Sequence, residues 1–374
     1  MKNLFTSIRN TIIKFFYKSF LKKLLFLADP EKVHHRFTQM GKLLGSNPFT
    51  RFLTKLSFSY QNKILEQNLF GQTFKNPVGL SAGFDKNAEL TQILPAVGFG
   101  FMEVGTITGE PCKGNAKPRL WRLPKSQALV VNWGLMNDGC KKAAEHLQNK
   151  KFKIPLIISV GKTNCAETAD EESGIKDYFK SYEKLLPLAD IIDINISCPN
   201  AFGGEPFTDP LKLEKLLNKI REIKTAKPVF LKMPCDLPFE KVDQLLEIAQ
   251  KHQITGVICT NLTKERNNPK IIDENIPETG AISGKVVEEK ADRMIAYVYK
   301  KTQGKLPIIG VGGIFSAEDA YKKIKLGASL VQLITGMIFE GPQLISEINL
   351  GLAKLLKKDG FKSLSEAIGI ENKY

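Results

Sequence analysis

Six consecutive residues, Asn195-Ile196-Ser197-Cys198-Pro199-Asn200, bring together two amides, a hydroxyl, a thiol and a chain-stiffening proline. They close the apolar run 191–194, which predicts a buried strand. A strand core does not need this chemistry, whereas a site that binds a flat polar molecule beside a reactive thiol does. Cys198 is therefore a candidate acid–base residue, because a thiolate is a competent base where its surroundings lower the thiol pKa. The alternative is a small buried hydrophobe, the usual fate of a free cysteine.

Lysines and asparagines follow or end other apolar runs. Lys86 follows the run 77–81, and Lys232 ends the run 228–233. A lysine among apolar residues could stabilise a developing anion, although a snorkelling surface lysine is the alternative. Asn195, Asn200 and Asn261 could donate and accept together toward an amide-bearing heterocycle, although a single asparagine at a strand end is more often a helix cap.

Glycine-containing pairs close the last two runs, as Gly312-Gly313 and Thr335-Gly336. Backbone N–H groups at a helix N-terminus and a threonine hydroxyl suit a phosphate. A tight turn is the alternative interpretation of each pair. The location after the seventh and eighth strands favours the phosphate, because barrels commonly bind phosphate there.

The positioning elements alternate regularly along the chain. Apolar runs predict strands at 77–81, 100–105, 155–160, 190–196, 228–233, 256–260, 307–311 and 329–335. Helical patterns follow at 87–97, 138–149, 176–187, 210–224, 239–251, 287–301, 317–326 and 342–357. Such alternation predicts an α/β fold with a parallel sheet, and eight units predict a (β/α)8 barrel. The alternative, a doubly wound open sheet, would not explain why all eight strand ends carry functional residue types.

The first 28 residues mix phenylalanine and aliphatic side chains with lysines, which interrupt every window long enough to span a bilayer. This pattern argues against a transmembrane helix, and a signal peptide would need an unbroken apolar core. It favours an amphipathic helix lying on a membrane surface, with an ordinary helix packed on the main domain as the alternative. Asp29-Pro30-Glu31 predicts the start of the next helix, with Asp29 as its N-cap. That helix is expected to end near residue 44, and a third helical piece to cover 49–57.

We therefore expect three parts: a small helical domain over residues 1–62, the barrel over 63–358 and a C-terminal tail over 359–374. Within the barrel, residues 106–133 exceed what a connection needs and contain an expected hairpin, 120–123 with 129–132. Residues 262–283 are long, polar and strand-free, which is typical of a lid.

The net charge of +15 indicates an anionic partner, such as a lipid surface or phosphorylated and carboxylated ligands. Basic residues are spread along the chain without an arginine-rich tract, which argues against nucleic acid. The six cysteines form no CxxC pair. With only four histidines, we expect neither disulfides nor a metal site, and a reducing compartment fits best.

Several motifs together resemble the dihydroorotate dehydrogenase family over residues 24–350. They are the segment Asn76-Pro77-Val78-Gly79-Leu80-Ser81-Ala82-Gly83-Phe84-Asp85-Lys86, the opening Asn-Ile-Ser-Cys-Pro-Asn motif, the segment 307–314, and Gly327-Ala328-Ser329-Leu330-Val331-Gln332. The resemblance implies an FMN-containing barrel that oxidises (S)-dihydroorotate to orotate in pyrimidine biosynthesis. Cys198 would take the C5 proton while a hydride leaves C6 for the flavin.

The resemblance also implies two sets of binding residues. The flavin set is Ala82, Gly83, Lys86, Thr106, Ser159, Asn195, Lys232, Thr260, Ser283, Gly284, Gly312, Gly313, Ile334 and Thr335. The pyrimidine set is Lys86, Asn132, Gly134, Leu135, Asn195, Asn200 and Asn261. Ser159 stands where many relatives have an asparagine that contacts the flavin.

The N-terminal helices resemble those of the quinone-using class, with His34 and Arg122 on the quinone side. This class implies peripheral attachment to an anionic membrane surface at the cytoplasmic face of the cell membrane. Three residues depart from its pattern: Cys198 replaces the usual serine, Asn132 is displaced by one position when Gly134 is held in register, and Ile334 replaces a frequent tyrosine. Cys198 instead resembles soluble relatives, which leaves two alternatives: a soluble acceptor, fumarate or NAD through a partner, or a non-catalytic barrel attached to the membrane.

Overall fold

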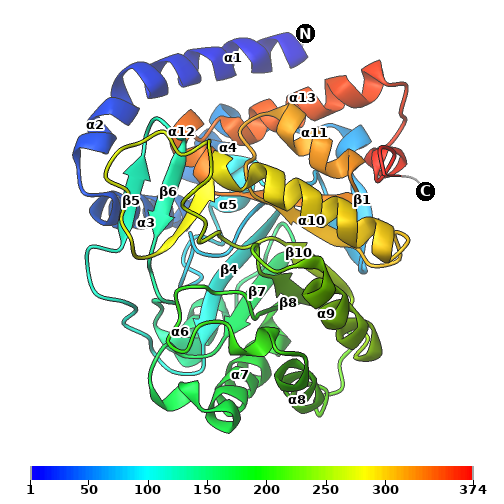
Figure 1. Cartoon of the computed structure of the whole chain (residues 1–374). Coiled ribbons are helices and arrows are strands. Elements are labelled where there is room, and N and C mark those ends of the chain that lie inside the picture. The colour runs from blue at the N-terminus through cyan, green and yellow to red at the C-terminus, as the bar shows by residue number, and fades with distance from the viewer. Residues whose placement is uncertain (1, 373–374) are drawn as a thin grey trace.

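Eight parallel strands close into a barrel in the computed structural model, which describes residues 2–372 (Figure 1). In chain order they are β3 (Val78–Leu80), β4 (Phe101–Thr108), β7 (Leu156–Gly161), β8 (Ile191–Asn195), β9 (Val229–Met233), β10 (Gly256–Cys259), β12 (Ile308–Val311) and β13 (Ala328–Leu333). Each expected apolar run overlaps one of them, and β4, β7 and β13 extend beyond their runs by one to three residues. Closure between β13 and β3 rules out the open doubly wound sheet.

Helices surround the barrel and bury one apolar face each. They are α5 (Leu94–Val97), α6 (Gly139–Leu147), α7 (Glu171–Leu185), α8 (Pro210–Ile220), α9 (Phe239–Lys251), α10 (Glu288–Lys301), α11 (Ala317–Lys325), α12 (Thr335–Glu340) and α13 (Leu344–Lys358). In α9 the buried residues Val242, Leu245, Leu246 and Ala249 follow the spacing of one helical face. Its bounds are those that the sequence predicted.

The first expected barrel helix, 87–97, is wrong over most of its length. Only α5 is helical, and the residues before it form turns. The carboxylate of Asp85 accepts the backbone N–H groups of Glu89 and Leu90, each at 2.8 Å. Ala88 takes a left-handed conformation with φ of 57°. Side-chain bonds of this kind compete with helix formation.

A hairpin closes one end of the barrel. It consists of β1 (Gln67–Leu69) and β2 (Gln72–Phe74). Phe74 packs edge-on against Phe101 with ring centroids 5.5 Å apart, and Phe70 packs against Phe230 at 5.2 Å. Phe101 and Phe230 lie at the starts of β4 and β9. The hairpin therefore closes the barrel at the N-terminal ends of its strands. A ligand can therefore enter only at the carboxyl ends.

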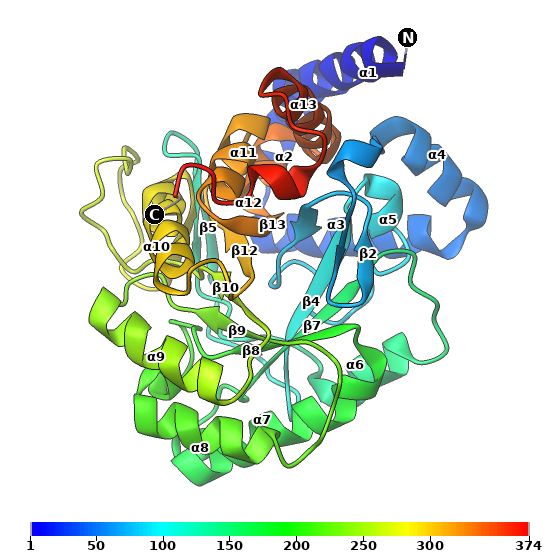
Figure 2. The ribbon, with the colours of Figure 1, turned by 90° about the vertical axis from the view of Figure 1, so that its right-hand side faces the viewer.

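The N-terminal segment lies across the outside of the barrel. It contains α1 (Lys2–Phe16), a π-helical turn (Tyr17–Leu21), α2 (Lys22–Leu27), α3 (Pro30–Ser46) and α4 (Pro48–Phe58). The Asp29 side chain accepts the Lys32 N–H at 2.8 Å, which confirms the expected helix cap. Helix α1 lies along α13 in Figure 1, and α4 packs against α5 in Figure 2.

Polar contacts hold α1 and the turn after it on the barrel. Arg9 donates to the Ser346 hydroxyl at 2.7 Å, and the Tyr17 hydroxyl donates to the Ile338 carbonyl at 2.6 Å. Lys18 pairs with Glu340 at 3.0 Å. The segment therefore packs on the barrel as an ordinary helical layer, while many of its apolar side chains remain exposed. No helix within residues 2–372 is long and apolar enough to cross a membrane.

A separate antiparallel sheet rises above the barrel mouth. Strands β5 (Leu120–Leu123) and β6 (Ala128–Val131) form the expected hairpin, and β11 (Ala281–Gly284) pairs with β6 as a third strand. The expectation that 262–283 lacks strands is thus wrong at its end. Four residues carry too little periodicity to predict a strand, and β11 forms because β6 offers it a free edge.

Short 3-10 helices complete the fold at Lys63–Leu65, Glu167–Ala169, Leu186–Leu188, Pro206–Thr208, Lys285–Val287 and Leu364–Ala367. The last of these places Leu364 and Ala367 in the core, so the end of the chain packs on the barrel.

Candidate active site

One large cavity opens at the carboxyl ends of the barrel strands, between them and the β5–β6–β11 sheet. It brings together most of the residues predicted from the sequence. These are His34, Ala82, Gly83, Lys86, Thr106, Gly134, Leu135, Asn195, Cys198, Asn200, Lys232, Thr260, Asn261, Ser283, Gly284, Gly312, Gly313, Ile334 and Thr335. Three predicted residues, Asn132, Ser159 and Arg122, do not line it.

Lys86 lies at the junction of the barrel and the N-terminal helices. Its Nζ is 3.0 Å from His34 Nε2 and 3.9 Å from the centroid of the Trp133 ring. Burial, together with the nearby Arg119 cation, lowers the pKa of Lys86 to about 7. Burial and Lys86 itself hold the pKa of His34 well below its usual value. Lys86 is thus a cation that exchanges its proton near neutral pH.

Asn132 points away from the cavity. Leu129 and Val131 line the cavity while Val130 packs on the opposite side of β6, and successive side chains along a strand alternate between faces. The amide oxygen of Asn132 accepts from Asn115 at 2.9 Å. Trp133 occupies the wall instead. The one-residue displacement noted in the sequence therefore removes Asn132 from the lining.

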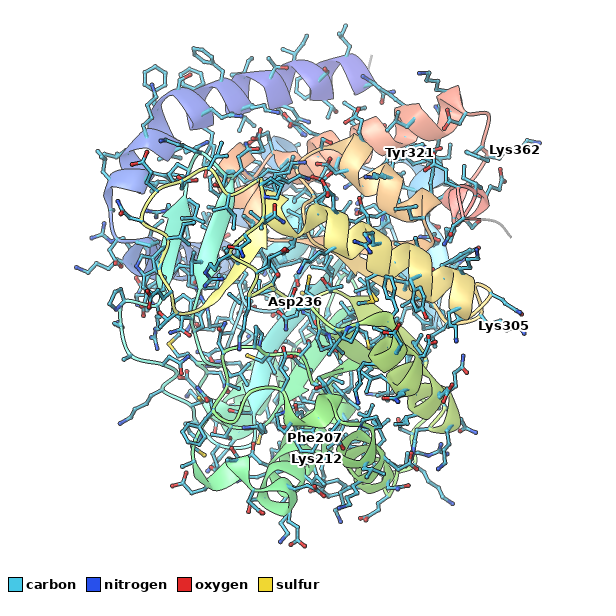
Figure 3. All side chains as sticks on the ribbon, viewed as in Figure 1. Phe207, Lys212, Asp236, Lys305, Tyr321 and Lys362 are labelled. Atoms are coloured by element: carbon cyan, nitrogen blue, oxygen red, sulfur yellow. The ribbon has the colours of Figure 1, made fainter. Side chains whose placement is uncertain are left out.

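A chain of polar side chains fixes the barrel side of the cavity. The Asn195 oxygen accepts from the Ser197 hydroxyl at 3.0 Å, and Asn261 donates to that hydroxyl at 3.0 Å. Tyr178 donates to the Asn195 carbonyl at 2.6 Å. Phe207, labelled in Figure 3, packs edge-on against Tyr178 at 5.3 Å. The amides that face a ligand are therefore held from behind.

Cys198 lines the cavity, and the groups around it shift the pKa of its thiol in opposite directions. Burial is the largest influence and raises the pKa of the thiol to about 11. The backbone N–H of Asn200 and the Lys162 cation act in the opposite direction, while Glu205 raises the pKa further. Lys162 is itself buried and donates to the Phe202 carbonyl at 2.9 Å. The resting site thus holds a neutral thiol with a cation nearby that favours the thiolate.

The arrangement of a thiol, ring-binding amides and glycine-rich turns at a barrel mouth can be compared with known proteins. A family model described as "Dihydroorotate dehydrogenase" matches residues 64–356. The chain belongs to the dihydroorotate dehydrogenase family.

Curated relatives match nearly the whole chain. A protein of Trichodesmium erythraeum named "Dihydroorotate dehydrogenase (quinone)" is 37% identical over 377 residues, covering 96% of this chain and 99% of the relative. One of Haloarcula marismortui with the same name is 39% identical over 314 residues, covering 84% and 88%. A ligand-free structure titled DHODH from Eimeria tenella superimposes with a TM-score of 0.82 at 29% identity, covering 92% and 100%.

Dihydroorotate dehydrogenases are flavoenzymes, and the glycine-rich part of the cavity fits such a group. Gly83 has φ of 108°, and a Cβ atom there would meet only Ile334 Cδ1, at 3.8 Å. The backbone therefore leaves open space on the cavity side. The Ser283 and Thr335 hydroxyls lie 2.8 Å apart between the sheet and the start of α12. These groups can approach a flat ring and its phosphate chain.

The opposite wall of the cavity is apolar. It consists of Leu120, Leu129, Val131, Ile334 and Ile338. Arg122 lies behind it, where it donates to the Ala28 carbonyl at 2.8 Å and its guanidinium carbon lies 4.7 Å from the Phe26 ring centroid. Arg122 therefore joins the sheet to α2 rather than facing the cavity.

Several residues in and around the site were not predicted from the sequence. Ser197 lay within the opening motif but carried no role, and Trp133 lay beside Asn132 without an aromatic pattern to mark it. Asn115 and Lys162 follow strands at positions where sequence alone assigns no direction. Within residues 2–372, no group of three or more His, Cys, Asp and Glu side chains could hold a metal ion.

Proposed function

We propose that this chain oxidises (S)-dihydroorotate to orotate in pyrimidine biosynthesis and passes the electrons to a membrane quinone. The observation that carries the proposal is the cavity at the carboxyl ends of the strands, which has a polar wall with Cys198 on one side and an apolar wall on the other. The first eight curated relatives, all named quinone-dependent, support the same acceptor.

FMN is the proposed flavin. Ala82, Gly83 and Lys86 would hold its ring, together with Thr106, Lys232 and Thr260. The turns Gly312-Gly313 and Ile334-Thr335, with Ser283 and Gly284, would hold its phosphate end. When bound, FMN supplies the hydride acceptor for the oxidation.

The pyrimidine would bind between Lys86, which offers a cation to its carboxylate, and Asn195, Asn200 and Asn261, which hold the ring. The backbone around Gly134 and Leu135 borders the same space. The Cys198 thiolate takes the proton from C5 of dihydroorotate as the hydride leaves C6, so that orotate gains a C5–C6 double bond. Lys162 stabilises the thiolate, and the proton then leaves the thiol for solvent.

The N-terminal segment is the proposed membrane and quinone domain, over residues 1–62, with the barrel at 63–358 and a tail at 359–374. All but three of the large exposed hydrophobic side chains, Phe202, Leu211 and Ile272, lie between residues 4 and 56. Phenylalanines and leucines beside lysines suit an anionic lipid surface. We infer peripheral attachment at the cytoplasmic face of the cell membrane, with His34 and Arg122 on the quinone side.

Acceptor-dependent turnover tests this assignment. Purified protein should oxidise dihydroorotate with a ubiquinone analogue and not with fumarate or NAD. Cys198, which resembles soluble relatives, favours the second candidate, in which a soluble acceptor takes the electrons. Turnover with fumarate and none with the quinone analogue would establish that candidate.

The flavin spectrum tests the enzymatic assignment as a whole. The purified protein should be yellow or should take up added FMN. A colourless protein that binds no FMN would instead be a non-catalytic barrel attached to the membrane.

A further inference from the structure

Two acidic side chains lie inside the barrel below the cavity floor. Glu103 comes from β4 and Asp193 from β8, and neither has any exposed surface. Lys232, on β9, is 4% exposed, and its Nζ lies 3.7 Å from Glu103 Oε2. The cluster therefore holds two fully buried carboxyl groups and one cation that borders the cavity.

Each carboxyl group has one satisfied oxygen and one unsatisfied oxygen. Glu103 Oε2 accepts the Ala82 N–H at 3.0 Å, and Asp193 Oδ2 accepts the Ser159 hydroxyl at 2.7 Å. Glu103 Oε1 and Asp193 Oδ1 are buried without a donor. Burying an unpaired acceptor is costly, and two such carboxylates side by side are costlier still.

A proton shared by the pair removes both costs, because it gives each free oxygen a partner and leaves one negative charge facing Lys232. The two carboxyl groups lie within hydrogen-bonding reach of one another. Burial and the Glu103 charge hold the pKa of Asp193 well above its usual value, against the opposing effect of Lys232. Tyr178 is the other titratable group that interacts with Asp193, and burial raises its pKa above the ordinary value.

A hydrogen-bond chain joins this pair to the cavity. Asn195 Nδ2 donates to Thr106 Oγ1 at 2.7 Å, and Thr106 Oγ1 lies 2.9 Å from Ser159 Oγ. The single hydrogen of Ser159 goes to Asp193, so Thr106 must be the donor to Ser159. Every bond of the chain therefore points toward Asp193. The Thr106 hydroxyl, which lines the cavity, has only a lone pair left for a ligand.

We propose that Asp193 is a positioning residue of this site, which shares one proton with Glu103 and, through Ser159, fixes the direction of the hydrogen bonds that Thr106 and Asn195 offer. A hydroxyl that can only accept suits a ligand N–H, such as the imide N–H of a flavin ring. The same chain holds the Asn195 amide with its nitrogen toward Thr106 and its oxygen toward Ser197. Ser159 thus acts from behind Thr106. This role rests on the proposed flavin function.

The shared proton is tested by infrared spectroscopy of the FMN-free protein at about pH 9, where ordinary carboxyl groups are ionised. Asp85 and Glu205, with pKa values of about 6 and about 7, are also ionised there. The wild type should show the carbonyl band of a protonated carboxyl group, and Asp193→Asn should lose it. The matched control is Asp177→Asn, which should keep the band, because Asp177 is another buried aspartate and its carboxylate accepts the backbone N–H groups of Thr163 and Gly109. No band in the wild type, or a band that survives Asp193→Asn, overturns the shared proton.

The positioning role is tested by titrating FMN into the same proteins. An asparagine at 193 can accept from Ser159 and donate to Glu103, so Asp193→Asn should bind FMN within about threefold of wild type. Asp193→Val and Ser159→Ala break the chain and should weaken binding about tenfold, the effect of losing one charge-assisted hydrogen bond. Ser159→Ala should keep the infrared band, which also shows that it folds. Wild-type affinity in Ser159→Ala overturns the positioning role, whereas a wild type that binds no FMN overturns the proposed function and leaves the infrared result standing.

Discussion

The two walls of the cavity differ in how they can recognise a molecule. The barrel wall includes Asn195 and Asn261, which are joined through the buried Ser197 hydroxyl, so the directions of their hydrogen bonds are fixed. The wall toward the N-terminal helices is apolar, with residues such as Leu129 and Ile338, and offers shape and dryness. The barrel wall therefore selects a ligand by the directions of its hydrogen-bond donors and acceptors, and the apolar wall selects a ligand by excluding water. A polar substrate and a lipid-soluble acceptor require this pairing.

The walls also differ in origin. The barrel wall comes from the ends of consecutive strands, whereas the apolar wall is assembled from the β5–β6 hairpin and α12. The N-terminal segment is attached to the second wall through two contacts: Phe26 packs edge-on against Phe339 at 5.4 Å, and Arg122 donates to the Ala28 carbonyl. A perturbation of one wall should therefore leave the chemistry of the other intact. Four predictions test this separation, beginning with the largest effect.

Replacing the Cys198 thiol should impair only the chemistry at the polar wall of the cavity. Cys198→Ala should slow reduction of the bound flavin by dihydroorotate about 10²–10⁴-fold, the range for loss of a general base, while FMN binding persists. Stopped-flow absorbance measures the rate. Cys165→Ala, a free cysteine outside the cavity lining, is the control and should react like wild type. An undiminished rate in Cys198→Ala would show that another group takes the proton.

Replacing exposed phenylalanines of the N-terminal segment by charged residues should impair only the delivery of quinone to the apolar wall. Phe15, Phe16 and Phe20 are 59%, 60% and 62% exposed and lie together. Replacing all three by Glu should weaken binding to anionic vesicles about a thousandfold, because a loss of roughly 1.5 kcal/mol of burial in lipid for each side chain, the low end of the range for a buried phenylalanine, amounts to about 4.5 kcal/mol for the three. Turnover with a soluble dye should not change. Leu211→Glu, on α8 and 75% exposed, is the matched control; equal loss in that variant would refute a membrane-facing N-terminus.

The two asparagines near the hairpin should differ in importance. Asn200 lines the cavity, whereas Asn132 is bonded to Asn115 and does not. Asn200→Ala should raise the KM for dihydroorotate about tenfold, and Asn132→Ala less than about threefold, since only the former loses a ligand hydrogen bond. Steady-state kinetics of both variants decides the point. Equal effects would mean that Asn132 turns inward when substrate binds.

Opposite shifts of the pH profile should follow from the charges around Cys198. The base is the thiolate, so the rate of flavin reduction should rise with pH toward the Cys198 pKa of about 11. Lys162 lowers that pKa and Glu205 raises it. Lys162→Met should therefore move the rising limb to higher pH and Glu205→Gln to lower pH, each by less than about one pH unit. Lys176→Met, on the exposed face of α7, is the control. Shifts of the same sign would exclude this electrostatic account.

The eight-stranded barrel was predictable because buried parallel strands are short continuous apolar runs, and each run overlaps one strand. The N-cap at Asp29 and both bounds of α9 were predictable because capping and helical periodicity are local. Residues 87–93 were not, because the Asp85 carboxylate satisfies backbone groups that a helix would otherwise use. Strand β11 was not, because its partner lies about 150 residues earlier in the chain.

The same division applies to the site. The sequence by itself determined which residue types reach the barrel mouth, because every parallel strand ends at the same edge and brings its following residues there. Only the tertiary structure decided that Asn132 points outward, that Ser159 lies behind Thr106 against Asp193, and that Arg122 holds α2. Each of these depends on the face of a strand and on partners far away in the chain. Side-chain direction changes with a shift of one residue, and only long-range strand pairing fixes that register.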